Sequence, residues 1–181
     1  PRTVQGALRD AAEDYLREGV DIQGAGRTDV GVHALGQVAH LKIRGTRDVN
    51  PDRLLREMND RLPADIAVLA VEETPNAFHA RHHAVNRAYL YQISTRKTAL
   101  SKKFVWWVKE ALNVELMSRG AAMLAGRHDF VCFRQKDPSR LDESTIVVVD
   151  RAEVDTDDHL VLFRVEASHF LWKMVRRLTG T

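Results

Sequence analysis

Residues 25–34 read Ala-Gly-Arg-Thr-Asp-Val-Gly-Val-His-Ala, and they stand directly before an apolar run that we expect to form a strand near 37–43. Glycine lets the backbone adopt positive φ and lets other groups approach it closely. This loop can therefore hold the carboxylate of Asp29 in a fixed geometry, with the cation of Arg27 two residues away. An ordinary tight turn, in which Asp caps a backbone group, would also explain glycines around an Asp. The density of polar groups around one carboxylate favours a functional site.

Around this loop, helical and strand patterns alternate along the chain. Apolar periodicity predicts helices over 2–18 and 113–125, a helix capped by Asn50 with Pro51 in its first turn, and a last helix after Ser168. Strand patterns lie at 66–71, at 84–95, and at 145–154 and 159–167, where an acidic turn between the last two predicts a hairpin. This mixture predicts an α+β fold with a mainly antiparallel, mixed sheet flanked by helices.

The composition is that of an ordinary globular protein. The chain has 181 residues, of which 44% are hydrophobic and 29% are charged, with a formal net charge of +2. No apolar run reaches the ~20 residues of a membrane-spanning helix, and the single Cys132 excludes an internal disulfide. We expect a cytoplasmic protein, whose slight basicity permits a phosphate-rich partner without requiring one.

Metal and nucleotide cofactors are not indicated. The densest histidine group, His79, His82 and His83, lacks the cysteine and carboxylate partners of a closed zinc site. Gly24-Ala25-Gly26 resembles the start of a phosphate-binding loop, but its third glycine position is occupied by Asp29. We therefore expect no metal and no cofactor. A metabolic enzyme that uses this loop for a phosphorylated small molecule stays a remote alternative.

One basic stretch contains aromatic residues. Lys102 and Lys103 lie close to Trp106 and Trp107, whose rings could stack on nucleic-acid bases. Alternation along a strand predicts instead that one of the two tryptophans is buried.

Three stretches in order resemble the motifs of the tRNA pseudouridine synthases of the TruA type. They are residues 26–34, the pair Phe78-His79-Ala80-Arg81 and Arg87-Ala88-Tyr89-Leu90-Tyr91, and residues 170–180 from Phe-Leu-Trp-Lys-Met to Gly. In helical geometry the apolar residues of the last stretch share one face, while Arg176 projects from the other. The chain departs from the family at Val30, where Ala is more usual, and at Trp172, Lys173 and Arg177.

The resemblance implies an isomerase that converts uridine to pseudouridine in tRNA. It assigns Asp29 as the catalytic nucleophile, Tyr89 as the residue against the target base and Arg176 as the partner of Asp29. Arg27, Thr28, His33, Arg81 and Arg87 become candidate substrate-binding residues. Whether Asp29 attacks C1′ or stabilises an electron-deficient C1′ is open at the level of sequence.

The resemblance also implies an organisation and a substrate. We expect an N-terminal lobe over 1–83 that carries the Asp loop and a C-terminal lobe over 84–181 that carries the Tyr strand and the Arg helix. The two lobes would form one catalytic unit around a central cleft. We expect a homodimer that acts on the anticodon stem-loop around positions 38–40, and we expect terminal elements of the family to be missing. A catalytically inactive RNA-binding relative is the alternative, against which the intact Asp29, Tyr89 and Arg176 set speaks.

Overall fold

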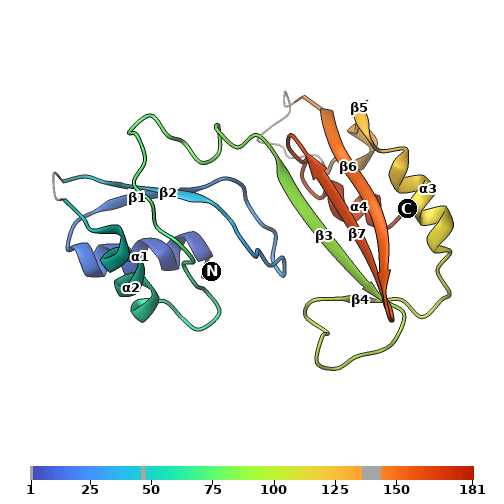
Figure 1. Ribbon diagram of the computed structural model, residues 1–181, viewed down its shortest axis with the longest axis horizontal. Helices are drawn as coiled ribbons and strands as arrows, with labels where there is room; N and C mark the ends of the chain where they lie inside the picture. Colours follow the sequence, from blue (N-terminus) through green and yellow to red (C-terminus); the bar gives the residue numbers. More distant parts are fainter. Residues whose placement is uncertain (1, 46–47, 136–143) are drawn as a thin grey trace. The chain divides into compact units, whose positions relative to one another are not determined.

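The computed structural model describes residues 2–45, 48–135 and 144–181. The chain divides into two compact units, Pro1–Ala84 and Val85–Thr181, and Figure 1 follows the elements of each in chain order. The first unit contains α1 (Val4–Leu16), β1 (Val20–Gly24), β2 (Ala39–Ile43) and α2 (Pro51–Arg61). The second contains β3 (Arg87–Ser94), β4 (Trp106–Trp107), α3 (Val114–Ala122), β5 (Gly126–Asp129), the 3₁₀ turn η1 (Val131–Phe133), β6 (Ile146–Asp157), β7 (Leu160–Ala167) and α4 (Met174–Thr179). No helix in this described part of the chain is long and apolar enough to cross a membrane.

In the first unit, two capped helices pack on one face of a two-stranded antiparallel sheet (Figure 1). The side chain of Thr3 accepts a hydrogen bond from the N–H of Gly6 (3.0 Å) at the start of α1. At α2, Asn50 accepts from the N–H of Arg53 (2.9 Å), with proline in the first turn as predicted. The buried core of this unit consists of Ala12, Leu16, Val20, Ile22, Leu54 and Met58.

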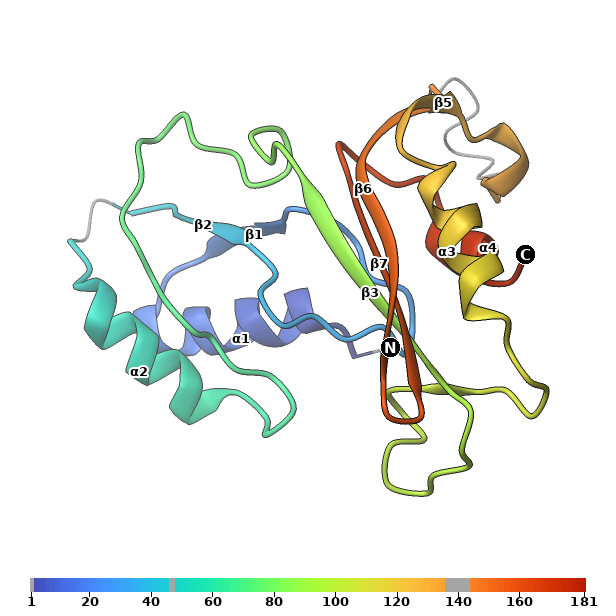
Figure 2. The ribbon, with the colours of Figure 1, turned by 45° about the vertical axis from the view of Figure 1, so that its right-hand side comes forward.

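In the second unit, five strands form a sheet in the order β4-β3-β7-β6-β5. Every neighbouring pair is antiparallel except the short parallel pairing of β3 with β4. Alternate residues of β7 are buried beneath α3 and α4, which cover one face of the sheet (Figure 2). The prediction of an α+β fold with a mainly antiparallel sheet flanked by helices is confirmed.

The strand predicted over 66–71 is wrong. At Val68 a side chain takes the place of a neighbouring strand, because the amide of Asn59 donates to the carbonyl of Val68 (2.9 Å) and accepts from its N–H (2.8 Å). The backbone groups of Val68, which a sheet partner would otherwise satisfy, are therefore already hydrogen-bonded. Its valines still pack against the core of the first unit.

The last helix is shorter than predicted. Residues 169–173 are not helical, and α4 begins at Met174 because Lys173 adopts a left-handed conformation with φ of 59°. Trp172 and His169 therefore do not share a helix with Arg176. The apolar contacts expected for this stretch are nevertheless present, since Leu171 and Met174 are buried in the core of the second unit. The sequence also predicts a highly charged loop over 134–143, and most of that stretch lies outside the described residues.

Candidate functional site

The loop between β1 and β2 holds Asp29 in a tight turn. The loop begins and ends on paired strands, with the N–H of Ala25 donating to the carbonyl of Val38 (2.8 Å). Within the loop, the N–H of Val32 donates to the carbonyl of Asp29 (3.0 Å), which closes a turn over Val30 and Gly31. Gly31 has φ of 81°, the value that the third position of a type II turn requires. The backbone around the carboxylate is thus set by a glycine-dependent turn.

The predicted site residues of this loop differ in exposure. Arg27, Thr28 and His33 are exposed, whereas Asp29 is half-buried. The side chain of Gln37 donates to the carbonyl of Gly26 (3.1 Å) and so holds the start of the loop against its end. The result is a carboxylate presented by ordered backbone, with cationic and hydroxyl side chains reaching solvent beside it.

The Phe78–Arg81 segment is attached to the same strand as this loop. The N–H of Ala80 donates to Nδ1 of His40 (3.2 Å), which lies on β2 two residues beyond Val38. His40 is buried, and no motif in the sequence indicated a role for it. Strand β2 therefore supports both the Asp29 loop and the segment that carries the exposed Arg81.

Four histidines pack together at this junction. The ring of His79 lies 4.6 Å from that of His40 and 4.2 Å from that of His82, measured between centroids. Nδ1 of His83 accepts from the N–H of His79 (3.4 Å). Burial, helped by the nearby His82, His40 and Lys42, lowers the pKa of His79. Among residues 2–45, 48–135 and 144–181, no three His, Cys, Asp or Glu side chains are grouped so as to hold a metal ion.

Tyr89 and Arg87 lie at the start of β3 in the second unit. Tyr89 is half-buried, and its ring meets that of Phe170 edge to face, with centroids 4.8 Å apart and planes at 81°. Arg87 donates from one guanidinium nitrogen to the carbonyl of Ser168 (2.8 Å). The start of β3 is thus fixed to the end of β7 and to the segment before α4. The ring of Tyr89 is thus positioned by its contact with Phe170, a residue whose role only the structure reveals.

The two neighbouring arginines of α4 have different surroundings. Arg177 donates to the carbonyl of Arg134 (2.8 Å), and it reaches that of Cys132 (3.5 Å), so its guanidinium joins α4 to η1. Arg176 is exposed and projects from the side of α4 opposite to the buried Met174. These contacts of Arg177 agree with a structural role for its side chain.

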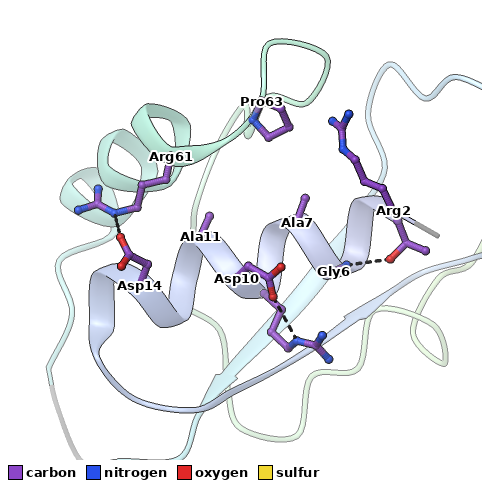
Figure 3. Close-up of a pocket in the computed structure, with 10 residues that line it drawn as sticks. Arg2, Gly6, Ala7, Asp10, Ala11, Asp14, Arg61 and Pro63 are labelled. Atoms are coloured by element: carbon purple, nitrogen blue, oxygen red, sulfur yellow. Dashed lines mark hydrogen bonds and ion pairs between the residues drawn. The ribbon is translucent and has the colours of Figure 1, made fainter.

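A separate hollow of about 740 Å³ lies between α1 and the end of α2 (Figure 3). The charged residues that line it already have partners. Asp14 pairs with Arg61 of the lining (2.8 Å), and two residues outside the lining complete the other pairs, Arg17 with Asp14 (2.9 Å) and Asp65 with Arg2. These pairs lower the pKa of Asp14, chiefly through the hydrogen bond from Arg61. None of the predicted site residues lines this hollow, and the Asp14–Arg61 pair joins the two helices of the first unit.

A family model and several curated proteins agree on the kind of protein that this chain resembles. The family model described as tRNA pseudouridine synthase matches residues 1–83 and 121–181. A tRNA pseudouridine synthase A of Agrobacterium fabrum is 41% identical over 99% of this chain and 68% of its own length. The tRNA pseudouridine synthase A of Paramagnetospirillum magneticum is 40% identical over 99% of this chain and 70% of its own length, and that of Aquifex aeolicus is 35% identical over 99% and 73%.

Proposed function

Because the chain belongs to the tRNA pseudouridine synthase family, we propose that it is an isomerase that converts uridine to pseudouridine in tRNA. The observation that carries the proposal is the ordered turn that presents Asp29 in a loop of the matched region. The reaction breaks the N1–C1′ glycosidic bond, turns the uracil and joins C1′ to C5. The proton of C5 leaves to solvent and N1 gains a proton, so atoms and charge balance without an electron donor or a transferred group.

In this proposal Asp29 acts at C1′. A carboxylate suits an electron-deficient sugar carbon, because it can either bond to that carbon or stabilise its positive charge. A base in a folded tRNA must leave its stack to reach such a group. Asp29 belongs to the first unit and Tyr89 to the second, so the proposed chemistry requires both units to act on one uridine.

The remaining residues hold the substrate. We propose that Tyr89, braced by Phe170, contacts the extruded uracil, and that Arg176 orients the carboxylate of Asp29. The exposed Arg27, Thr28, His33 and Arg81 would contact the RNA near the target nucleotide. Arg87, which already donates to the carbonyl of Ser168, would contribute from the start of β3.

The finer parts of the proposal concern substrate and assembly. We propose the anticodon stem-loop, around positions 38–40, as the target and a homodimer in the cytoplasm as the acting form. These parts rest on the family resemblance alone. Each can fail without affecting the assignment of the reaction.

The test is release of tritium from tRNA labelled at uridine C5. The protein is expected to release one tritium for each target uridine without any added cofactor, and the product should map to positions 38–40. Binding of tRNA with no release would identify an inactive RNA-binding relative instead. Release with product at other positions would retain the reaction and reject the anticodon target.

A further inference from the structure

A basic and aromatic surface lies at the edge of the second unit, in a part of the chain that the family model does not match. Residues 95–109 contain five lysines or arginines and no Asp or Glu. They form the loop after β3 and the edge strand β4 (Figure 1). We call the group of Lys97, Lys102, Lys103, Trp106 and Trp107 the Lys–Trp surface.

Both tryptophans of this surface are exposed, which corrects the expectation that one is buried. Trp106 is 45% exposed and Trp107 is 42% exposed. Strand β4 consists of these two residues and pairs with the end of β3, at the edge of the sheet. The ring of Trp106 meets that of Tyr91 edge to face, with centroids 6.3 Å apart, and still leaves nearly half of its side chain in water. Large aromatic surface left in water is costly, and a cluster of it on a protein often marks a binding site.

The lysines stand beside these rings. Nζ of Lys97 lies 5.3 Å from the ring centroid of Trp107, within the range of a cation–π interaction. Lys102 and Lys103 are exposed in the turn that the N–H of Phe104 closes onto the carbonyl of Ser101 (2.8 Å). Within the described parts of the chain, no carboxylate forms an ion pair with any of these three lysines.

Arg96 of the same loop has different surroundings. It lies near Asp158 in the turn between β6 and β7, where a hydrogen bond from His159 and, to a lesser degree, the charge of Arg96 lower the pKa of Asp158. The N–H of Thr95 donates to the carbonyl of His159 (2.9 Å), which fixes this side of the loop to that turn. Arg96 therefore faces an acidic neighbour and serves as a matched control for the lysines.

We propose that the Lys–Trp surface binds a second segment of the tRNA, with phosphates at Lys102 and Lys103 and an unstacked base on Trp107. Aromatic rings and cations together are the chemistry by which proteins hold unpaired nucleotides. Trp107 pairs with Ser94, five residues along β3 from Tyr89, so it lies roughly 17 Å from the proposed uracil contact. That span corresponds to about five base pairs of rise, so the segment is not the target nucleotide itself. This inference rests on the proposed function.

The experiment measures tRNA affinity at several salt concentrations for four proteins. They are the wild type, Trp107→Ala, the double variant Lys102→Ala/Lys103→Ala and the control Arg96→Ala. Trp107→Ala is expected to weaken binding about 5- to 150-fold, the range for the loss of one stacked base. The double variant should reduce the slope of log affinity against log salt by about 1.4 to 1.8, because each lost phosphate contact removes about 0.7 to 0.9. Arg96→Ala should change affinity by less than about twofold.

The outcomes separate this inference from the proposed function, because tritium release by the wild type is measured on the same preparation. If the wild type releases tritium while both Lys–Trp variants bind tRNA with its affinity and salt slope, the surface is not an RNA site. If the wild type releases no tritium but the variants lose tRNA binding as predicted, the Lys–Trp surface is an RNA-binding site and the proposed isomerisation is refuted. An equal loss in Arg96→Ala would mean that the loop contributes only diffuse positive charge, and it would overturn the inference. The double lysine variant changes only exposed side chains, so it answers the question even if Trp107→Ala folds poorly.

Discussion

Replacement of Gly31 by alanine tests whether the turn over residues 29–32 sets the position of Asp29. Gly31 has φ of 81°, and no atom lies within 4 Å of the place where a Cβ would stand. The cost of Gly31→Ala is therefore backbone strain alone, roughly 1–2 kcal/mol for an L-residue in left-handed conformation. A penalty of that size shifts a two-state equilibrium by about 5- to 30-fold.

The assay for this prediction is single-turnover tritium release, with thermal unfolding as a check on the fold. Gly31→Ala is expected to lower the rate about 5- to 30-fold, because the loop leaves the turn that presents Asp29. Gly31→Asn should lose less, since asparagine tolerates positive φ better than other residues do. Gly36→Ala is the control, since Gly36 lies in the same loop with open space around it and without positive φ. A wild-type rate for Gly31→Ala, or an equal loss for Gly36→Ala, would refute the reasoning.

Three further predictions concern single side chains. Tyr89→Phe should keep most of the activity and Tyr89→Ala should lose more, because stacking on a base is worth roughly 1–3 kcal/mol; equal, near-complete losses in the tritium assay would point to the hydroxyl instead. Arg176→Lys should lose most of the single-turnover rate, because lysine lacks the planar guanidinium that binds a carboxylate through two hydrogen bonds. Arg177→Ala should mainly lower the melting temperature, because it removes the hydrogen bond that joins α4 to η1. A large loss of rate in Arg177→Ala with a near wild-type rate in Arg176→Lys would mean that the wrong arginine was chosen. Because the pKa of His79 is lowered in the folded protein, the imidazole takes up a proton at a higher pH in the unfolded chain than in the folded one. The free energy of unfolding should therefore fall as the pH drops below about 6.5. Urea unfolding at several pH values should show that the free energy of unfolding falls less steeply for His79→Gln than for the wild type.

Local patterns predicted the parts of the fold that depend on neighbouring residues. Asn50 followed by Pro51 predicted the start of α2, and the structure has both the cap and the proline in place. Strand β1 was missed, although Val20 and Ile22 alternate with polar residues, because five residues are too few for the pattern to stand out. Lys173 in left-handed conformation delayed α4, and no local pattern in the sequence indicates that conformation.

The features of the fold and of the candidate site that local patterns did not predict depend on contacts between residues that are separated in the sequence. The apolar run over 66–71 resembles a strand, but the Asn59 side chain that satisfies Val68 lies on the preceding helix. The sequence allowed the candidate site to be predicted as far as its glycine-dependent turn, because Gly31 lies two residues from Asp29. It did not allow the contribution of His40 to be predicted, since the hydrogen bond from Ala80 to His40 joins residues 40 positions apart.

The central claim, that Asp29 carries the chemistry, is tested most directly by Asp29→Asn. The change is nearly isosteric and preserves the backbone turn, in which Asp29 takes part through its carbonyl. It removes the negatively charged oxygen that acts at C1′ in the proposed reaction. Single-turnover tritium release from saturating tRNA should therefore be abolished, while tRNA affinity stays within a few-fold of the wild type. An Asp29→Asn protein that retains a substantial fraction of the wild-type rate would contradict the account.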